Sequence, residues 1–202
     1  MSAVALVRRR LAGDFEVDEW GLDPDVVSVL SPLFGLRFSL DVRGAQHLPG
    51  QGPALLVYNR RFGSSEPFVV ARAVRLETGR HLRVAGVPDL PVAGPMLRRI
   101  GGVLDRPDEI ASVLRVGHLA GVALGRGLDP RSRTGAPDVA TIAEARLAEV
   151  PVHPVALIGK ESRRGWRVEI GPAMATSWTE GPLGDAALAD ALRSAIESLL
   201  AT

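Results

Sequence analysis

The sequence of 202 residues contains no cysteine and a single lysine, Lys160. The absence of cysteine excludes disulfides, thiolate nucleophiles and cysteine-based zinc sites. Aromatic residues make up only 4% of the chain, and no segment reaches the ~20 apolar residues that a membrane-spanning helix needs. Arg8, Arg9 and Arg10 follow a short apolar run, which reverses the order found in a secretory signal. These features favour a cytoplasmic protein that is soluble or attached to the periphery of a membrane.

What the chain does contain is a globular composition, with 46% apolar and 23% charged residues. The 24 basic and 23 acidic residues give a net charge of +1, so no global field favours a nucleic acid as partner. The histidines and carboxylates do not have the spacing of metal ligands, and we expect no metal site.

Apolar patterns typical of strands alternate with patterns typical of helices. Residues 54–58 form a continuous apolar run, as in a buried central strand, and Asp23 before Pro24 predicts the start of a helix. Further strands are predicted at 38–42, 82–87, 121–124, 150–158 and 166–170, with a turn and a short strand at 101–106. Further helices are predicted at 67–78, 107–118, 138–149 and from a cap at Asp185, and at 88–99 with a break near Pro91 or Pro95. The alternation predicts an α/β fold with a mixed, mainly parallel sheet flanked by helices.

One of the predicted strands contains proline, which restricts its place in the sheet. Pro151 and Pro154 restrict the strand at 150–158 to a short strand or to a sheet edge, because proline cannot donate to a ladder. The domain organisation that we expect is a helical lead-in over residues 1–37 and a single α/β domain over residues 38–202.

Four segments follow one another in an order that a known family shares. Residues 47–67 (HLPGQGPALLVYNRRFGSSEP) hold a Leu-Pro loop, a strand and Asn59, and residues 100–109 (IGGVLDRPDE) hold an Asp-Arg pair. Residues 123–127 (ALGRG) end a strand, and residues 150–159 (VPVHPVALIG) hold a Pro-Val-x-Pro-Val-Ala element. This order resembles the glycerophospholipid acyltransferases, the lysophosphatidate and glycerol-3-phosphate acyltransferase group, over about residues 18–172.

The resemblance implies an acyltransferase-like fold with its site at the strand ends. It also implies an acyl-thioester donor, acyl-CoA or acyl-ACP, and a glycerophosphate-type acceptor. We expect no tightly bound cofactor, and the thioester would serve as donor only if the protein is active.

The sequence departs from the family pattern where the chemistry is expected. The family has Asn-His with an Asp a few residues on, whereas this chain has Arg60 in place of His and Ser65 in place of Asp. A third-motif Glu is replaced by Arg126. A guanidinium stays protonated and cannot take the hydroxyl proton, a step that contributes typically ~10²–10⁴-fold. These departures predict a catalytically degenerate relative.

We therefore expect a site that binds an anionic lipid or a phosphorylated small molecule. Arg60, Arg106 and Arg126 would face one pocket and contact the anion through paired hydrogen bonds. The resemblance implies that Arg106 binds phosphate. The expected binding residues are Asn59, Arg60, Arg61, Ser65, Arg106, Arg126 and Gly127.

Three alternatives stay open. The protein could regulate a protein partner, or it could be an active acyltransferase in which Glu66 or water acts as the base. It could also be an unrelated α/β ligand-binding or interaction domain. Contact with an anionic membrane could come from Leu6, Val7 and Leu11 beside Arg8–Arg10, or from apolar residues in 87–97.

Overall fold

The computed structural model describes residues 3–13, 17–60, 65–88, 90–91, 93–125, 134–135, 138–175 and 181–202. Its centre is a seven-stranded sheet with the strand order β1-β7-β6-β2-β5-β3-β4. The strands are β1 (Ser39–Arg43), β2 (Ala54–Asn59), β3 (Leu82–Val87), β4 (Gly102–Leu104), β5 (Leu119–Leu124), β6 (Val152–Gly159) and β7 (Gly165–Ile170). Five strands run parallel, and β7 and β1 run in the opposite direction. The predicted mixed, mainly parallel sheet is confirmed.

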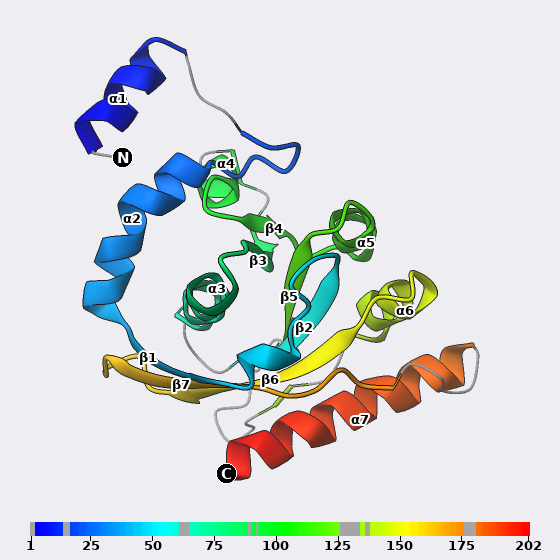
Figure 1. The fold of residues 1–202 in the computed structure, drawn as a ribbon. Helices are drawn as coiled ribbons and strands as arrows, with labels where there is room; N and C mark the ends of the chain where they lie inside the picture. Colours follow the sequence, from blue (N-terminus) through cyan, green and yellow to red (C-terminus); the bar gives the residue numbers. More distant parts are fainter. Residues whose placement is uncertain are drawn as a thin grey trace.

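Helices cover both faces of the curved sheet (Figure 1). Helix α3 packs on the concave face, whereas α5, α6 and α7 pack on the other. The helices are α1 (Ala3–Leu11), α2 (Pro24–Arg37), α3 (Glu66–Thr78), α4 (Ala93–Arg98), α5 (Pro107–Arg115), α6 (Val139–Leu147) and α7 (Pro182–Ala201), with a 3-10 turn, η1, at Ala45–His47.

Strand β2 joins the two halves of the core. All six of its residues are buried, as expected for a continuous apolar run in a central parallel strand. Leu55 and Val57 face the cluster under α5, α6 and α7, while Leu56 and Tyr58 face the cluster under α3. Because fully burying such an aliphatic side chain contributes about 1.5–3 kcal/mol, this strand fixes the position of the residues that follow it.

The prediction that the proline-containing strand is short or at an edge is wrong. Strand β6 has eight residues and lies inside the sheet, between β7 and β2. Pro154 is tolerated because it lies where β7 ends: the antiparallel ladder stops at Val155 and Ile170, and Gly171 N donates to Pro154 O at 2.8 Å. The Gly171 carbonyl accepts from His153 Nδ1 at 3.1 Å, in place of the N–H that proline lacks.

The N-terminal part of the chain is helical, and one of its two helices was predicted. Asp23 caps α2 as expected, accepting from the amides of Asp25 and Val26. Helix α1 lies away from the sheet layers (Figure 1). It was not predicted, because its residues show no clear apolar period in the sequence. The segment between the helices is tied to the domain by Asp18, which accepts from Trp20 N and Leu22 N and pairs with the buried Arg83 of β3.

Two helix predictions differ from the structure in part. The helix expected at 88–99, with a break near Pro91 or Pro95, spans Ala93–Arg98, so it begins after Pro91, and Pro95 fits within its first turn. Asp185 does not cap α7, because Gly181 occupies the cap and Asp185 lies in the first turn. Its carboxylate instead pairs with Arg146 of α6, and both side chains are largely buried.

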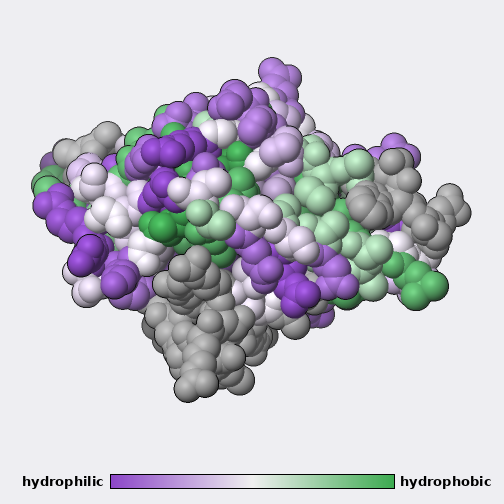
Figure 2. Space-filling view, turned by 90° about the horizontal axis from the view of Figure 1, so that it is seen from below, coloured by the Kyte–Doolittle hydropathy of each residue, from purple (hydrophilic) through white to green (hydrophobic). Residues whose placement is uncertain are grey.

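Surface character varies over the molecule. On the face shown in Figure 2, hydrophilic residues lie beside apolar patches, with a broad pale-green area on the side of α6 and α7. None of the helices in the described ranges has both the length and the apolar character needed to cross a bilayer.

Candidate functional site

The candidate site lies at the edge of the sheet where the five parallel strands end. Ligands of open α/β sheets bind in the crevice outside the carboxyl ends of the strands. Arg60 follows β2, Asp105 follows β4 and Gly125 follows β5, so the topology brings these positions to the same edge. The topology thus brings these strand ends together, and a functional role of this edge stays a prediction.

A cavity with a volume of about 450 Å³ lies beside this edge, between α3, β3 and the α4–β4 segment. This volume falls in the range of ~300–1,000 Å³ that is usual for small-molecule sites. Among the described residues of its lining, Arg60 is the one that carries a charge, and the others are apolar or glycine. They are Pro67, Phe68, Ala71, Val84, Ala85, Gly86, Val87, Pro88, Leu97, Ile100, Gly101 and Gly102.

The Arg60 guanidinium lies beside the backbone of Gly86 in the cavity wall. Gly86 has a φ of 113°, and the β3–β4 register shifts around it, so this residue forms an irregularity at the end of β3. A Cβ atom built on Gly86 would lie 3.7 Å from Arg60 Nη1, which places the guanidinium directly beside this backbone. Within the described part of the chain, Arg60 has no hydrogen-bond or ion-pair partner. A positive charge thus borders an apolar cavity, where an anion would compensate it.

Asn59 is turned away from solvent and is 1% exposed. Its Nδ2 donates to Leu157 O at 3.0 Å, and its Oδ1 accepts from Leu157 N at 2.6 Å. The side chain thus extends the pairing of β2 with β6 by one residue. It thereby fixes the position of the backbone from which the Arg60 side chain extends. A contact of Asn59 with substrate stays a prediction.

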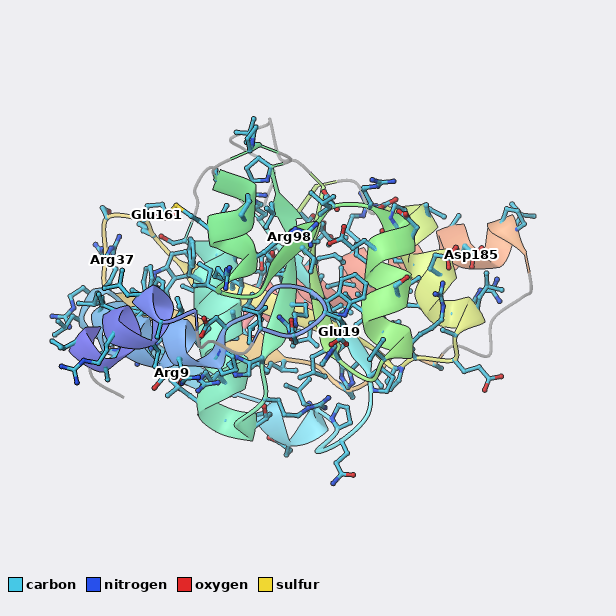
Figure 3. The ribbon with its side chains drawn as sticks, turned by 90° about the horizontal axis from the view of Figure 1, so that it is seen from above. Arg9, Glu19, Arg37, Arg98, Glu161 and Asp185 are labelled. Atoms are coloured by element: carbon cyan, nitrogen blue, oxygen red, sulfur yellow. The ribbon has the colours of Figure 1, made fainter. Side chains whose placement is uncertain are left out.

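Ser65, where the resemblance implies an aspartate, is held by a residue that the sequence did not indicate. Its backbone N donates to Glu161 Oε1 at 2.8 Å, and its Oγ donates to Glu161 Oε2. Arg37 in turn donates to the carbonyls of Glu161 and Arg163. Figure 3 shows Arg37 and Glu161 on the same side of the molecule. These contacts fasten the start of α3 to the β6–β7 connection, and no motif in the sequence pointed to Glu161.

Glu66, the candidate base, is the first residue of α3 and is 3% exposed. The buried Tyr58 hydroxyl lies within the electrostatic reach of several groups at this site. Burial raises the pKa of Tyr58 most strongly, the Arg60 guanidinium lowers it, and the Glu66 and Asp105 carboxylates raise it further. The net effect raises the pKa of Tyr58, so the hydroxyl stays protonated. This hydroxyl has no hydrogen-bond partner in the described residues. Tyr58 was not predicted as part of the site.

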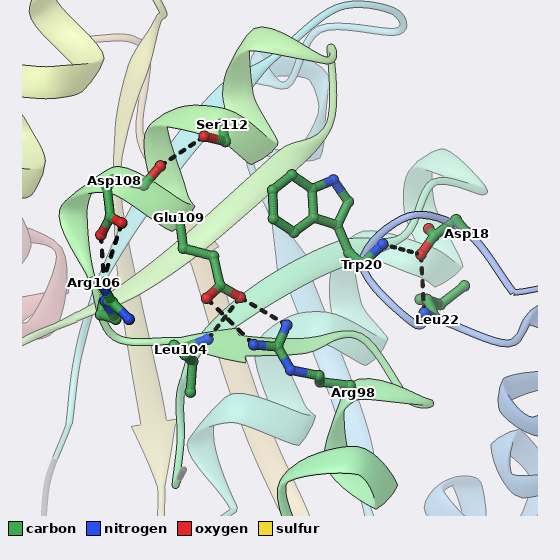
Figure 4. A network of polar contacts seen from close by, with 9 residues as sticks. All are labelled: Asp18, Trp20, Leu22, Arg98, Leu104, Arg106, Asp108, Glu109 and Ser112. Atoms are coloured by element: carbon green, nitrogen blue, oxygen red, sulfur yellow. Dashed lines mark hydrogen bonds and ion pairs between the residues drawn. The ribbon is translucent and has the colours of Figure 1, made fainter.

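Arg106 lies at the N-cap position of α5 and its side chain is 63% exposed. Its Nε lies 3.5 Å from Asp108 Oδ1, as drawn in Figure 4, and it does not line the cavity that Arg60 borders. The structure therefore does not bring Arg106 into that cavity with Arg60, and a phosphate contact of Arg106 stays a prediction. Arg61, Arg126 and Gly127 lie outside the described residues.

A second ion pair supports the cavity wall. Arg98 Nη1 and Nη2 donate to the Glu109 carboxylate at 2.8 and 3.3 Å, and Leu104 N donates to Glu109 Oε1 at 3.1 Å (Figure 4). These bonds join α4, β4 and α5, and α4 supplies Leu97 to the cavity. Arg98 and Glu109 belong to different elements, so only the tertiary fold brings them together.

An adjoining cavity of about 240 Å³ lies between α2 and α3. It shares Phe68, Ala71 and Ile100 with the first cavity. Arg72 and Arg75 line this second cavity and are already engaged, Arg72 with Ser31 O at 3.0 Å and Arg75 with the ring of His81. The second cavity is therefore less apolar than the first, and the two are separated by the side chains that they share.

The arrangement is suited to binding an anion that carries an apolar group. The described lining of the first cavity contains no histidine, cysteine or carboxylate that could accept a proton from a substrate hydroxyl. Among the described residues, His, Cys, Asp and Glu do not gather in any group of three or more that could hold a metal ion.

Comparison with solved structures identifies the class of fold. The chain is similar to the 1-acyl-sn-glycerophosphate (LPA) acyltransferase PlsC from Thermotoga maritima, with a TM-score of 0.61 over 88% of this chain and 77% of that chain. The two sequences are 14% identical, so this likeness describes the fold alone. The chain therefore has an acyltransferase-like fold, as the motif order predicted.

Comparison with sequences gives relatives without a described activity. The uncharacterized protein Rv0502 of Mycobacterium tuberculosis is 32% identical, over 80% of this chain and 50% of the relative. The uncharacterized protein ML2427 of Mycobacterium leprae is 30% identical, over 80% of this chain and 49% of the relative. The chain thus spans about half the length of the curated relatives it matches. No family model matches the sequence.

Proposed function

We propose that this chain is a catalytically degenerate relative of glycerophospholipid acyltransferases that binds an anionic lipid without transferring its acyl group. The observation that carries the proposal is Arg60, an arginine that has no partner in the described residues and borders an apolar cavity. The acyltransferase-like fold supports a lipid as ligand, because PlsC, which shares the fold, is named for its action on an acylglycerophosphate. An acyl chain would occupy the apolar cavity, and its anionic head group would contact the Arg60 guanidinium.

The same position argues against acyl transfer by the mechanism of the family. Where the resemblance implies a histidine base, Arg60 stays protonated at physiological pH and cannot accept a proton. Where it implies an orienting aspartate, Ser65 donates its N–H and O–H to Glu161. Acyl transfer with Glu66 or water as the base is the alternative function, supported by the place of Glu66 at the start of α3, where its carboxylate acts on the Tyr58 hydroxyl.

A binding experiment tests the proposal. Purified protein would be titrated with a fluorescent long-chain lipid that carries an anionic head group, and with a neutral lipid that has the same chain. We expect the anionic lipid to bind and Arg60→Ala to weaken its binding, while Arg193→Ala on the remote helix α7 leaves the affinity unchanged. Equal binding of both lipids, unaffected by Arg60→Ala, would argue against Arg60 as the anion contact.

We also propose that the protein works in the cytoplasm, at the periphery of a membrane. Val4, Val7 and Leu11 recur along one side of α1 and are 72%, 57% and 85% exposed, with Arg8 exposed among them. A helix with apolar and basic residues at its surface can lie in the interface of an anionic bilayer. Sedimentation with anionic vesicles should therefore be reduced by replacing these three apolar residues with serine. If the variant sediments as the parent protein does, α1 is not the contact.

A further inference from the structure

We infer that a phosphate group binds between α2 and α3, in the cavity that Arg72 and Arg75 line. The phosphate belongs to a monoester or is free, and its site is distinct from the one proposed at Arg60. Side chains that the two cavities share lie between them, so a ligand at one site does not require a ligand at the other.

The cavity lies on the concave side of the sheet, where α2 runs beside α3 (Figure 1). Phe34 of α2 and Phe68 of α3 stack in its wall, with ring centroids 5.4 Å apart. Arg72 and Arg75 are three residues apart on α3, so their side chains leave the same side of the helix and both line the cavity. Its volume of about 240 Å³ exceeds the ~150 Å³ of a cavity that holds benzene, which leaves room for a phosphate with a small organic group.

Both guanidinium groups are held by neutral acceptors. Arg72 Nη1 donates to Ser31 O at 3.0 Å and to Ser31 Oγ at 3.3 Å. Arg75 Nη1 lies 2.5 Å from Nε2 of the His81 ring. Neither guanidinium forms an ion pair with any described residue, and the described lining contains no carboxylate. Two like charges on one side of a helix repel each other, and an anion bound to both would offset that repulsion.

Some donors of these two side chains are not engaged by the described residues. A guanidinium has five N–H donors, and the described hydrogen bonds of Arg72 and Arg75 all come from Nη1. Arg72 Nε is buried without a described partner, which is unfavourable unless an acceptor reaches it. Gly35 of α2 makes room for this guanidinium, because a Cβ atom at position 35 would lie 2.9 Å from Arg72 Nη2. The packing of α2 thus positions an arginine whose donors suit an acceptor with several oxygens.

Phosphate suits this cavity better than a single carboxylate does. A phosphate monoester carries about −1.5 to −2 at pH 7 and three acceptor oxygens, so it can bind two guanidinium groups at once. Burial, Arg75 and His118 lower the pKa of His81 to about 4, so the described charged groups that act on this ring are both basic. The neutral ring accepts from Arg75, and a dianion beside it would favour its protonated form.

Binding of three phosphate probes tests this site. The probes are inorganic phosphate, glycerol 3-phosphate and dihexanoyl phosphatidate below its micelle concentration, with glycerol as the neutral control. Calorimetry at about pH 7.5, where the phosphates are largely dianionic, would give the affinities. We expect glycerol 3-phosphate to bind and glycerol not to bind. Arg72→Gln and Arg75→Gln should each weaken phosphate binding roughly 10- to 100-fold, the range for losing a charged hydrogen-bonded partner.

The lipid probe identifies where the phosphate comes from. Phosphatidate binding more tightly than glycerol 3-phosphate, with a loss on Arg72→Gln, would identify a lipid head group whose chains contact the apolar wall. Equal affinities would identify a small phosphate ester or free phosphate. Both results support a phosphate site between α2 and α3.

A ligand-dependent melting temperature separates binding from stability. Arg72 holds α2 through Ser31, so Arg72→Gln can lower stability whether or not a ligand binds there. A ligand that binds the folded state raises its melting temperature by mass action, and a variant that lost only stability would gain as much as the parent protein. We expect a much smaller gain in Arg72→Gln and Arg75→Gln, at a glycerol 3-phosphate concentration that just saturates the parent protein. Arg193→Gln, on the remote helix α7, should gain as much as the parent protein.

The titration of His81 gives a second measurement. Saturating glycerol 3-phosphate should raise the pKa of His81, whose NMR signal is identified by its loss in His81→Asn. An unchanged titration would overturn the inference, as would phosphate binding that Arg60→Gln weakens and Arg72→Gln does not, because the phosphate would then lie elsewhere. Failure of all three probes to bind would overturn it too, and would leave the lipid site proposed at Arg60 to its own test.

Discussion

At the scale of single residues, some polar groups of the site make hydrogen bonds within the described part of the chain, and others do not. Asn59 and Ser65, which were expected to contact substrate, make hydrogen bonds to Leu157 and Glu161 that hold the strand and helix ends. Tyr58 buries a hydroxyl without a described partner, and Arg60 presents a charge without one. Of the residues predicted to bind substrate, Asn59 and Ser65 therefore stabilise the fold, whereas Arg60 has no partner among the described residues.

Replacing Tyr58 with phenylalanine should make the protein more stable. The hydroxyl is buried and makes no described hydrogen bond, so folding removes it from water without compensation. Removing such a group should raise the free energy of unfolding by about 1–3 kcal/mol. Urea denaturation of the two proteins would measure the difference, and a clear loss of stability would mean that the hydroxyl has a partner within the fold.

His153 should make the stability of the fold depend on pH. Burial lowers the pKa of this histidine, the hydrogen bond to Gly171 opposes that effect, and His47 adds to it. Because the folded pKa lies below the unfolded value of about 6.5, the unfolded chain binds the proton more readily. The stability is therefore complete above about pH 6.5 and falls as the pH is lowered from there toward the folded pKa.

Denaturant unfolding at several pH values between about 7 and 5 would measure this effect. His153→Asn can keep a donor for the Gly171 carbonyl but does not titrate, so its stability should fall less steeply over that interval. Identical slopes for the two proteins would assign the pH dependence to other groups. His81 is one such group, since burial, Arg75 and His118 lower its pKa to about 4.

At the scale of secondary-structure elements, local patterns predicted most of the strands and helices but not their partners. The apolar run of β2 and the Asp23 cap of α2 appear where they were expected. The predicted position of β6 at a sheet edge was wrong, because the hydrogen bond from His153 to Gly171 replaces the one that Pro154 cannot make. A hydrogen bond between a side chain of one strand and the backbone of another cannot be recognised from the sequence alone.

The anchoring of α3 predicts that an aspartate at position 65 would destabilise the protein. Ser65→Asp would place a carboxylate against Glu161, whose oxygens accept from Ser65 N and Oγ. We expect this variant to lose about 1–3 kcal/mol of stability, since like charges would meet where a hydroxyl now donates. Adding Glu161→Gln should recover part of the loss, because a carboxamide can donate to the new carboxylate.

Urea denaturation of the parent protein, the two single variants and the double variant would measure this interaction as a double-mutant cycle. Glu161→Gln alone serves as the control for the loss of the existing contacts. Additive effects of the two substitutions would show that residues 65 and 161 do not interact as the structure describes.

At the scale of the whole molecule, the motif order predicted the fold, whereas the site required the structure. The spacing of motifs along a chain reflects the order of strands and loops, and the likeness to PlsC confirms the fold that this order predicted. The apolar cavity depends on residues from α3, β3 and α4 that no single pattern joins. Glu161 was missed because it reaches the site only through tertiary contacts, whereas Tyr58 was read from the sequence only as part of a buried strand.

We propose that this chain, with its acyltransferase-like fold, binds an anionic lipid without transferring its acyl group. The most direct measurement is thiol release from palmitoyl-CoA by the purified protein, with glycerol 3-phosphate and lysophospholipids pooled as acceptors and Glu66→Gln assayed in parallel. We predict release no faster than the control without protein, under conditions in which anionic lipid still binds. Turnover by the parent protein that Glu66→Gln abolishes would contradict the claim and identify Glu66 as the catalytic base.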